Sequence, residues 1–407
     1  MIMTVENTSL KNEYPFFTHN PSCIYLDTAA TSQKPRVVIQ KVQDILEQKN
    51  ASVHRGVYPL SQQMTTEFEQ TRDCIKSFLD VPQSHEILFT NGATHAFNFL
   101  ANSLLELLQH NPHKNEIVLS ELEHHANIVP WQEFSKKYGF TITYIPLSED
   151  NTISVETAKK YITQKTAIVS VTHLSNVLGS VIDVKSIVAH AQKHSAITII
   201  DGSQSISHIP VSLLEIQSDF YVCSGHKLGA LTGCGFIVSK RDILQKIKPF
   251  LFGGHMIKTV GKESYTLNDI PYCFEAGTPP IVECISLSQA IRFLQENMNL
   301  IFQNESAVLE HTLTSLQAIP DLVVYTTNNQ AGIVSFRHKH ISSYDIATLL
   351  GEKNICVRCG HHCCMPLMKA LAVVGTIRVS IGAYTTKKDI DVFVSELQHI
   401  ITILEKT

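Results

Sequence analysis

Short apolar segments alternate with helical segments through most of this chain. Each apolar segment is rich in β-branched or aromatic residues and ends at polar or glycine residues, as buried strands do. Alternation of this kind predicts a mostly parallel sheet with helices on both faces. The predicted strands are 86–90, 116–120, 141–146, 167–172, 197–201 and 220–224, and the predicted helices between them are 93–109, 129–138, 155–161 and 184–194.

The pattern changes near Val282, where a long helical segment begins and continues to about Leu316. Candidate strands follow at 323–325, 332–336 and 376–380. This order predicts a second, smaller α+β domain, and a chain of 407 residues is long enough for two domains. We expect a large domain of residues 16–289 and a small domain of residues 1–15 and 290–407, packed closely because no Ser- or Gly-rich linker separates them.

Composition narrows the possible partners. A net charge of -4 with scattered Lys and Arg gives no electrostatic case for nucleic acid. No apolar run approaches the roughly 18 residues of a membrane span, and residues 1–10 do not resemble a secretion signal. We therefore expect a cytoplasmic protein without membrane partners, whose ten cysteines are free thiols.

The segment from Arg358 to Cys364 concentrates an arginine, two histidines and three cysteines. A zinc site is one interpretation, but structural zinc usually takes ligands from two separated knuckles, and no second knuckle is nearby. Buried cysteines that pack as small apolar side chains are another. The third is a reactive thiol, because Gly360 permits a tight turn and the basic residues favour a thiolate. The sequence of this segment alone does not decide among these three interpretations.

Polar residues follow several predicted strands, at the edge where open α/β sheets bind ligands. Asp201 ends one strand, although an Asp there often simply caps a turn, and Lys227 comes shortly after the next. The segment 91–94 (Asn-Gly-Ala-Thr) opens a predicted helix. The free N–H groups at a helix start suit a phosphate, although Gly and Thr at this position also simply cap helices. His124 follows the strand 116–120. An acid, an amine, a phosphate cradle and a histidine together match the needs of pyridoxal phosphate.

Further motifs occur along the chain at 25–31, 53–56, 123–131, 172–179, 201–204, 224–227, 275–279 and 358–363. In these motifs the chain resembles the SufS-type, or group II, cysteine desulfurases, within the class-V aminotransferase group of fold-type I pyridoxal-phosphate enzymes. The resemblance implies an α/β fold, with a large domain built on a mostly parallel mixed sheet flanked by helices and a smaller α+β domain. It also implies a homodimer whose active sites are completed across the interface, with no resident metal.

The resemblance assigns roles to individual residues. Lys227 would carry pyridoxal 5'-phosphate on its amine, and Lys227, Cys363 and His124 would be catalytic. The remaining cofactor contacts would come from Asp201, Gln204, Ala93, Thr94, Ser224 and His226. Thr278 would reach the phosphate of the cofactor bound in the other subunit. Substrate contacts would come from Asn176, Arg378, Arg55, His54 and His362.

The implied reaction converts L-cysteine to L-alanine. Lys227 would remove the Cα proton, and Cys363, placed by register directly after Gly-His-His, would take the sulfur as a persulfide. An acceptor protein of SufE or SufU type would then receive it for iron–sulfur cluster assembly. The alternatives are a selenocysteine lyase on the same scaffold, a cysteine-rich metal-binding or redox-sensing protein on a degenerate transferase fold, and another class-V activity such as kynureninase or an aminotransferase, which leaves Cys363 unexplained.

Overall fold

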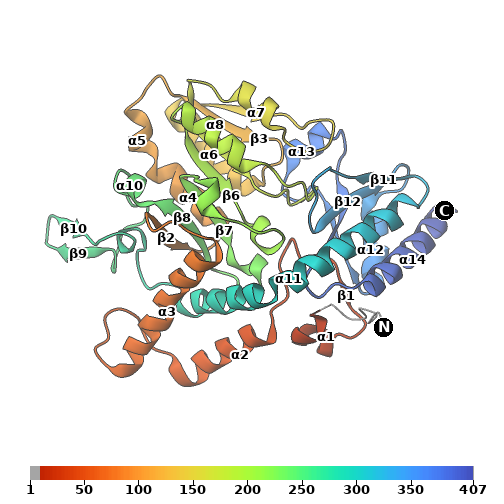
Figure 1. The fold of residues 1–407 in the computed structure, drawn as a ribbon, viewed down its shortest axis with the longest axis horizontal. Helices are drawn as coiled ribbons and strands as arrows, with labels where there is room; N and C mark the ends of the chain where they lie inside the picture. Colours follow the sequence, from red (N-terminus) through yellow and green to blue (C-terminus); the bar gives the residue numbers. More distant parts are fainter. Residues whose placement is uncertain (1–9, 407) are drawn as a thin grey trace.

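The computed structural model describes residues 10–406. Most of the segment considered above as a secretion signal, and most of the 1–15 range assigned to the small domain, lie outside the described residues. The chain forms a large sheet with helices on both faces and a smaller sheet with its own helices near the carboxyl terminus (Figure 1). None of the helices among the described residues is both long and apolar enough to cross a membrane.

The large sheet has seven strands in the order β2-β8-β7-β6-β5-β3-β4. All run in one direction except β8, which is antiparallel to both of its neighbours. Every strand predicted for this half of the chain is present within about one residue. Strand β8 is absent from the prediction because it follows β7 without a full helix between them, which breaks the alternation. The bounds are β2 (His85–Thr90), β3 (Glu116–Ser120), β4 (Thr141–Ile145), β5 (Thr166–Thr172), β6 (Ile197–Asp201), β7 (Phe220–Ser224) and β8 (Gly235–Lys240).

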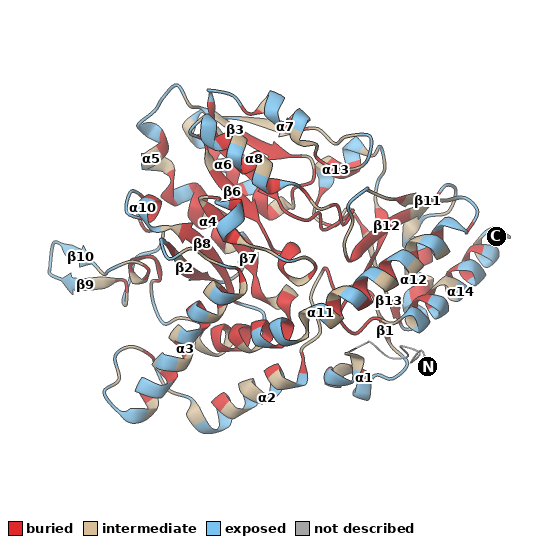
Figure 2. Ribbon diagram, in the orientation of Figure 1, coloured by how far each residue is buried: buried red, intermediate tan, exposed pale blue. Residues whose placement is uncertain are grey.

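Side chains that alternate along these strands enter two different buried clusters. Ile199 belongs to one cluster and Ile200 to the other, as expected when successive residues point to opposite faces. Burial of both faces explains why the strands read as continuous apolar runs (Figure 2). The helices of this region are α2 (Arg36–Asp44), α3 (Pro59–Phe78), α4 (Ala93–Ser103), α5 (Leu105–Gln109), α6 (Val129–Tyr138), α7 (Val155–Tyr161), α8 (Val184–Lys193), α9 (Leu213–Ile216) and α10 (Arg241–Leu244).

The smaller sheet is antiparallel, in the order β11-β12-β15-β14, and has a buried cluster of its own. The 37-residue helix α11 joins the two parts, since Ile285 packs in a cluster of the large sheet and Val308 in that of the small one. The elements of this part are α11 (Ile281–Gln317), β11 (Leu322–Tyr325), β12 (Ile333–His338), α12 (Ser343–Glu352), β13 (Ile355–Cys356), β14 (Arg358–Gly360), α13 (Met365–Ala370), β15 (Thr376–Ser380) and α14 (Lys387–Leu404).

Four short elements, α1, β1, β9 and β10, lie apart from the seven-stranded and four-stranded sheets. Helix α1 (Pro15–His19) precedes β1 (Ile24–Tyr25), which pairs in parallel with β13, so an early segment of the chain packs on the small domain. Strands β9 (Ile257–Val260) and β10 (Tyr265–Leu267) form an exposed hairpin. The division at residues 15 and 289 stays a prediction, and the β1–β13 pairing ties residues 24–25 to the second range.

Candidate active site

A cavity of about 160 Å³ lies where the carboxyl ends of β3, β5, β6 and β7 face strands β14 and β15 of the small sheet. Most of the side chains assigned from the sequence line it. These are Ala93, Thr94, His124, Asn176, Asp201, Ser224, His226, Lys227, His362, Cys363 and Arg378. The remaining lining residues, which the sequence prediction does not include, are Ala29, Ala30, Ala126, Ser203 and Arg358.

The acid and the amine come from neighbouring strands. Asp201 ends β6 and is 6% exposed, and its Oδ1 accepts a hydrogen bond of 2.9 Å from the backbone N–H of Ser203. Lys227 lies in the short 3-10 turn Gly225–Leu228 that directly follows β7. Burial lowers the pKa of Lys227, with Asp201 opposing the shift and Arg378 adding to it. The neutral form of the Lys227 amine is therefore populated at a lower pH than that of a surface lysine.

The start of α4 offers backbone N–H groups to the cavity. Gly92 precedes this helix with a φ of 128°, which favours glycine, and Ala93 N–H donates to Ser224 Oγ at 2.9 Å. His226 Nδ1 lies 3.2 Å from Thr31 Oγ1. This arrangement of a helix start with hydroxyl and imidazole groups suits a phosphate.

His124 lies beside the acid and the amine. Burial, and after it the charge of Lys227, lower the pKa of His124 to about 3. Its Nδ1 accepts a hydrogen bond of 3.1 Å from Ala126 N–H. The ring is therefore neutral and held in one orientation, as a stacking surface requires.

Glu123, which precedes His124, is a residue that sequence reasoning missed. Its carboxyl group is fully buried and accepts hydrogen bonds from Asn127 Nδ2 at 2.7 Å, Thr172 N–H at 3.0 Å and the Ser120 hydroxyl. Burial outweighs these donors and raises the pKa of Glu123 to about 8. The available signal was a charged residue three positions after the end of the buried strand β3.

Arg378 connects three segments at the edge of the cavity. It is 2% exposed, its Nη1 donates to the Asn176 carbonyl at 2.9 Å and its Nη2 donates to Asp27 Oδ1 at 2.8 Å. Asn176 Nδ2 in turn donates to the His362 carbonyl at 2.9 Å. The guanidinium therefore has a fixed position from which to meet a carboxylate. Sequence reasoning missed Asp27, whose partner Arg378 lies at the other end of the chain.

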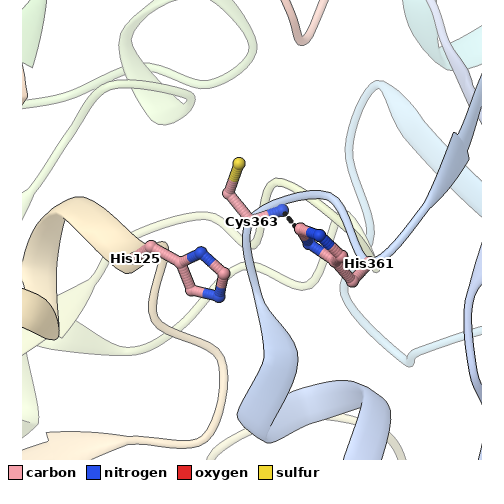
Figure 3. Close-up of side chains that lie close together, drawn as sticks. All are labelled: His125, His361 and Cys363. Atoms are coloured by element: carbon pink, nitrogen blue, oxygen red, sulfur yellow. Dashed lines mark hydrogen bonds between the residues drawn. The ribbon is translucent and has the colours of Figure 1, made fainter.

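The loop that carries Cys363 connects β14 to α13. Two successive non-glycine residues, His362 and Cys363, adopt left-handed conformations with φ of 51° and 56°. His125 N–H donates to the Cys363 carbonyl at 2.7 Å, and Met365 N–H donates to His125 Nε2 at 3.1 Å. On the other side, Cys363 N–H donates to His361 Nδ1 at 3.1 Å (Figure 3). Hydrogen bonds on both sides of Cys363 thus hold an uncommon backbone conformation.

The three cysteines of the cluster have different surroundings. Cys363 is half-buried and lines the cavity. Cys364 is fully buried, with its Sγ 3.7 Å from the Glu121 carbonyl, and burial raises the pKa of its thiol far above the ordinary value. Cys359 lies on β14, where burial raises the pKa of its thiol to about 11. Of the three, Cys363 is the one placed to react with a molecule in the cavity.

Several buried polar atoms of the cavity residues have no hydrogen-bond partner among the described residues. They are Ser203 Oγ, His362 Nδ1 and Arg378 Nε. Buried polar atoms in folded proteins are normally bonded, so these three cavity residues have hydrogen-bonding capacity that a polar ligand could use. Together with the amine, the buried acid and the helix start, they fit pyridoxal phosphate and an amino-acid substrate.

Four assigned residues lie outside this cavity. Gln204 is just behind it, with Nε2 donating to the Ala29 carbonyl at 2.9 Å. Thr278 and Arg55 are exposed. His54 and Arg55 line a separate cavity of about 400 Å³, in which His54 Nε2 lies 2.8 Å from Glu69 Oε1.

Comparisons with known proteins match nearly the whole chain to one family. Residues 24–393 match the family model Aminotransferase class-V. A probable cysteine desulfurase of Halalkalibacterium halodurans is 41% identical over 376 residues, or 92% of each chain. One of Staphylococcus aureus is 39% identical over 377 residues, or 92% of this chain and 91% of the other.

Two solved structures are similar to this chain in shape. The apo cysteine desulfurase from Thermococcus onnurineus matches with a TM-score of 0.91 and 30% identity, over 97% of each chain. The cysteine desulfurase CsdA from Escherichia coli matches with a TM-score of 0.89 and 29% identity, over 98% of this chain and 100% of the other. These likenesses confirm the predicted fold class, the fold-type I α/β architecture.

Proposed function

The chain belongs to the class-V aminotransferase family and is a pyridoxal-phosphate-dependent cysteine desulfurase, and from this premise we propose that it transfers the sulfur of L-cysteine to Cys363. The observation that carries the proposal is the position of Cys363, half-buried and facing the same cavity as Lys227 and Asp201. Cys359 and Cys364 do not line this cavity.

The cavity residues would hold the cofactor by complementary chemistry. Lys227 would bind it covalently, Asp201 would pair with the pyridine nitrogen, and His124 would stack on the ring, with Gln204 near the ring hydroxyl. Its phosphate would meet the start of α4, with Ala93, Thr94, Ser224 and His226 around it. When bound, pyridoxal phosphate accepts the electron pair that is left when the substrate loses its Cα proton.

The chain's own residues would then orient the substrate and move its proton. Arg378 would bind the substrate carboxylate through its guanidinium, with Asn176 and His362 beside it. Lys227 Nζ would take the Cα proton, a role that suits an amine whose pKa is lowered by burial.

Cys363 would act as the nucleophile. Its thiolate forms a bond to the substrate sulfur while the Cβ–S bond of the substrate breaks, and the carbon skeleton leaves as alanine after protonation. The products balance as one persulfide on Cys363 and one L-alanine for each L-cysteine. Partial exposure of Cys363 would let the terminal sulfur pass onward.

We further propose the SufS-type partners. The persulfide would be delivered to an acceptor protein of SufE or SufU type for iron–sulfur cluster assembly in the cytoplasm. A homodimer is supported by residues that a single chain leaves outside its cavity, Arg55 and Thr278, and by exposed apolar side chains on and near the β9–β10 hairpin. These are Phe252, Val260 and Tyr265.

The test compares wild-type protein with Cys363→Ala and Lys227→Ala. We expect alanine from L-cysteine with wild type, a loss of roughly 100-fold or more with Lys227→Ala, and a similar loss with Cys363→Ala. Selenocysteine as substrate distinguishes a desulfurase from a selenocysteine lyase, because a lyase releases selenium without a protein thiol. A wild-type protein that makes alanine only from selenocysteine, equally well with Cys363→Ala, would overturn the desulfurase in favour of a selenocysteine lyase.

A further inference from the structure

Three potential metal ligands lie close together at the tip of the cysteine loop. His125, His361 and Cys363 each offer one ligand atom, and these atoms lie within 4.8 Å of one another (Figure 3). All three residues are half-buried, so an ion from solvent can reach them. We propose that they form a zinc site that caps the Cys363 thiol and reversibly arrests the enzyme.

The folded structure brings together metal ligands from two segments that are far apart in the sequence. The cysteine-rich segment has no second group of ligands near it in the sequence, which argued against zinc. Two ligands, His361 and Cys363, come from the loop between β14 and α13, whereas His125 comes from the segment after β3 of the large sheet. The site therefore lies between the two parts of the molecule and forms only when the loop is seated on His125.

The ligand set selects the kind of metal. One thiolate and two imidazoles suit Zn²⁺, and their softness disfavours Mg²⁺ and Ca²⁺, which prefer oxygen. Three protein ligands leave a fourth tetrahedral position for water. As the S–Zn bond forms, the thiol of Cys363 releases its proton to solvent, so one proton leaves for each zinc bound.

Binding requires a local rearrangement. The imidazole lone pairs at His125 Nε2 and His361 Nδ1 already accept backbone N–H groups from Met365 and Cys363. Zinc must take these lone pairs or bind the opposite ring nitrogens after a change of tautomer. Ligand atoms around a tetrahedral zinc lie roughly 3.5 Å apart, so the loop must also draw in. These costs make the site reversible rather than structural.

The consequence for activity rests on the proposed role of Cys363, whereas the binding itself does not. Coordination to zinc lowers the nucleophilicity of the thiolate sulfur and holds it at the two imidazoles instead of at the substrate sulfur. Zinc would therefore block persulfide formation, and a chelator would restore it.

Binding is measured on the holoenzyme without substrate. Zinc chloride is titrated against a chromogenic chelator, and Cys363 is then alkylated with iodoacetamide and quantified by mass spectrometry. We expect zinc to slow alkylation of Cys363 at least tenfold, to leave alkylation of Cys359 unchanged, and to lose its effect when EDTA is added. Equal alkylation of Cys363 with and without zinc would overturn the site.

Variants identify the ligands. We expect Cys363→Ser, His125→Ala and His361→Ala each to weaken zinc binding at least tenfold, and the matched control Cys359→Ser to leave it unchanged. Wild-type affinity in the His125→Ala/His361→Ala double variant would overturn the proposal, because zinc would then be held without the imidazoles. Alanine production from L-cysteine is assayed separately, so a failed zinc site and a failed desulfurase give different results.

Discussion

At the scale of single residues, Glu123 gives the molecule a pH dependence of its own. Burial raises its pKa from the ordinary 4.5 to about 8. Between these values the unfolded chain has released the proton while the folded protein still holds it. The free energy of unfolding therefore falls as the pH rises through this window, by at most about 1.4 kcal/mol per pH unit.

Glu123→Gln removes this titrating group. We expect the variant to be less stable at pH 5, because the new amide opposes the Asn127 Nδ2 donor, and to lose stability less steeply from pH 5 to 8 than wild type. Urea unfolding at several pH values measures both effects. The control Glu133→Gln changes an exposed carboxylate and should follow wild type. A slope in Glu123→Gln that equals the wild-type slope would contradict a raised pKa.

At the scale of elements, His125 makes two of the hydrogen bonds that hold the loop between β14 and α13 against the large-sheet part of the molecule. His125 holds it through its backbone N–H to Cys363 and through its ring to Met365 N–H. His125→Ala removes the second bond, which contributes about 0.5–1.5 kcal/mol. We expect kcat to fall by up to roughly tenfold and metal-free alkylation of Cys363 to become faster.

The control for this variant is His110→Ala, an exposed histidine beyond α5. It should change neither kcat nor the alkylation rate. Slower alkylation of Cys363 in His125→Ala would mean that the ring exposes the thiol rather than holding the loop in place.

Comparison of the predicted helices and strands with the observed ones shows which features the sequence could predict. Six of the seven strands of the large sheet were predictable, the central ones because both of their faces are buried, which leaves continuous apolar runs. Asp201 and Lys227 were predictable because they end or follow such runs. The break between α4 and α5 at Leu104 was missed, since the helical pattern continues across it. Asp27 and His125 were missed as site residues because their roles depend on partners distant in the sequence, Arg378 and Cys363.

At the scale of the whole molecule, the cavity proposed to bind the substrate lies between the large sheet and the small sheet. Arg378 of β15 in the small sheet bonds to Asn176, which follows β5 of the large sheet, and to Asp27, which follows β1. Two planar N–H groups on one guanidinium make both bonds, and a lysine amine cannot reproduce this geometry. The arginine therefore joins these segments, and in the proposed role it would present a fixed cation to the substrate carboxylate.

Arg378→Lys should consequently weaken substrate binding more than it slows the chemistry. Loss of a hydrogen bond to a charged group costs about 1.5–3 kcal/mol, so we expect KM for L-cysteine to rise roughly 10- to 150-fold with a smaller change in kcat. Steady-state alanine production measures both constants. Arg337→Lys, on β12 and away from the cavity, is the control. An unchanged KM in Arg378→Lys would exclude Arg378 as the carboxylate ligand.

The most direct test of the whole account is the mass of the Cys363 peptide after the holoenzyme reacts once with L-cysteine in the absence of reductant. We expect one additional sulfur atom on Cys363, in a ratio of one to one with the alanine formed, and none on Cys359 or Cys364. Alanine formed without sulfur on Cys363, or with the sulfur on Cys364, would contradict the account.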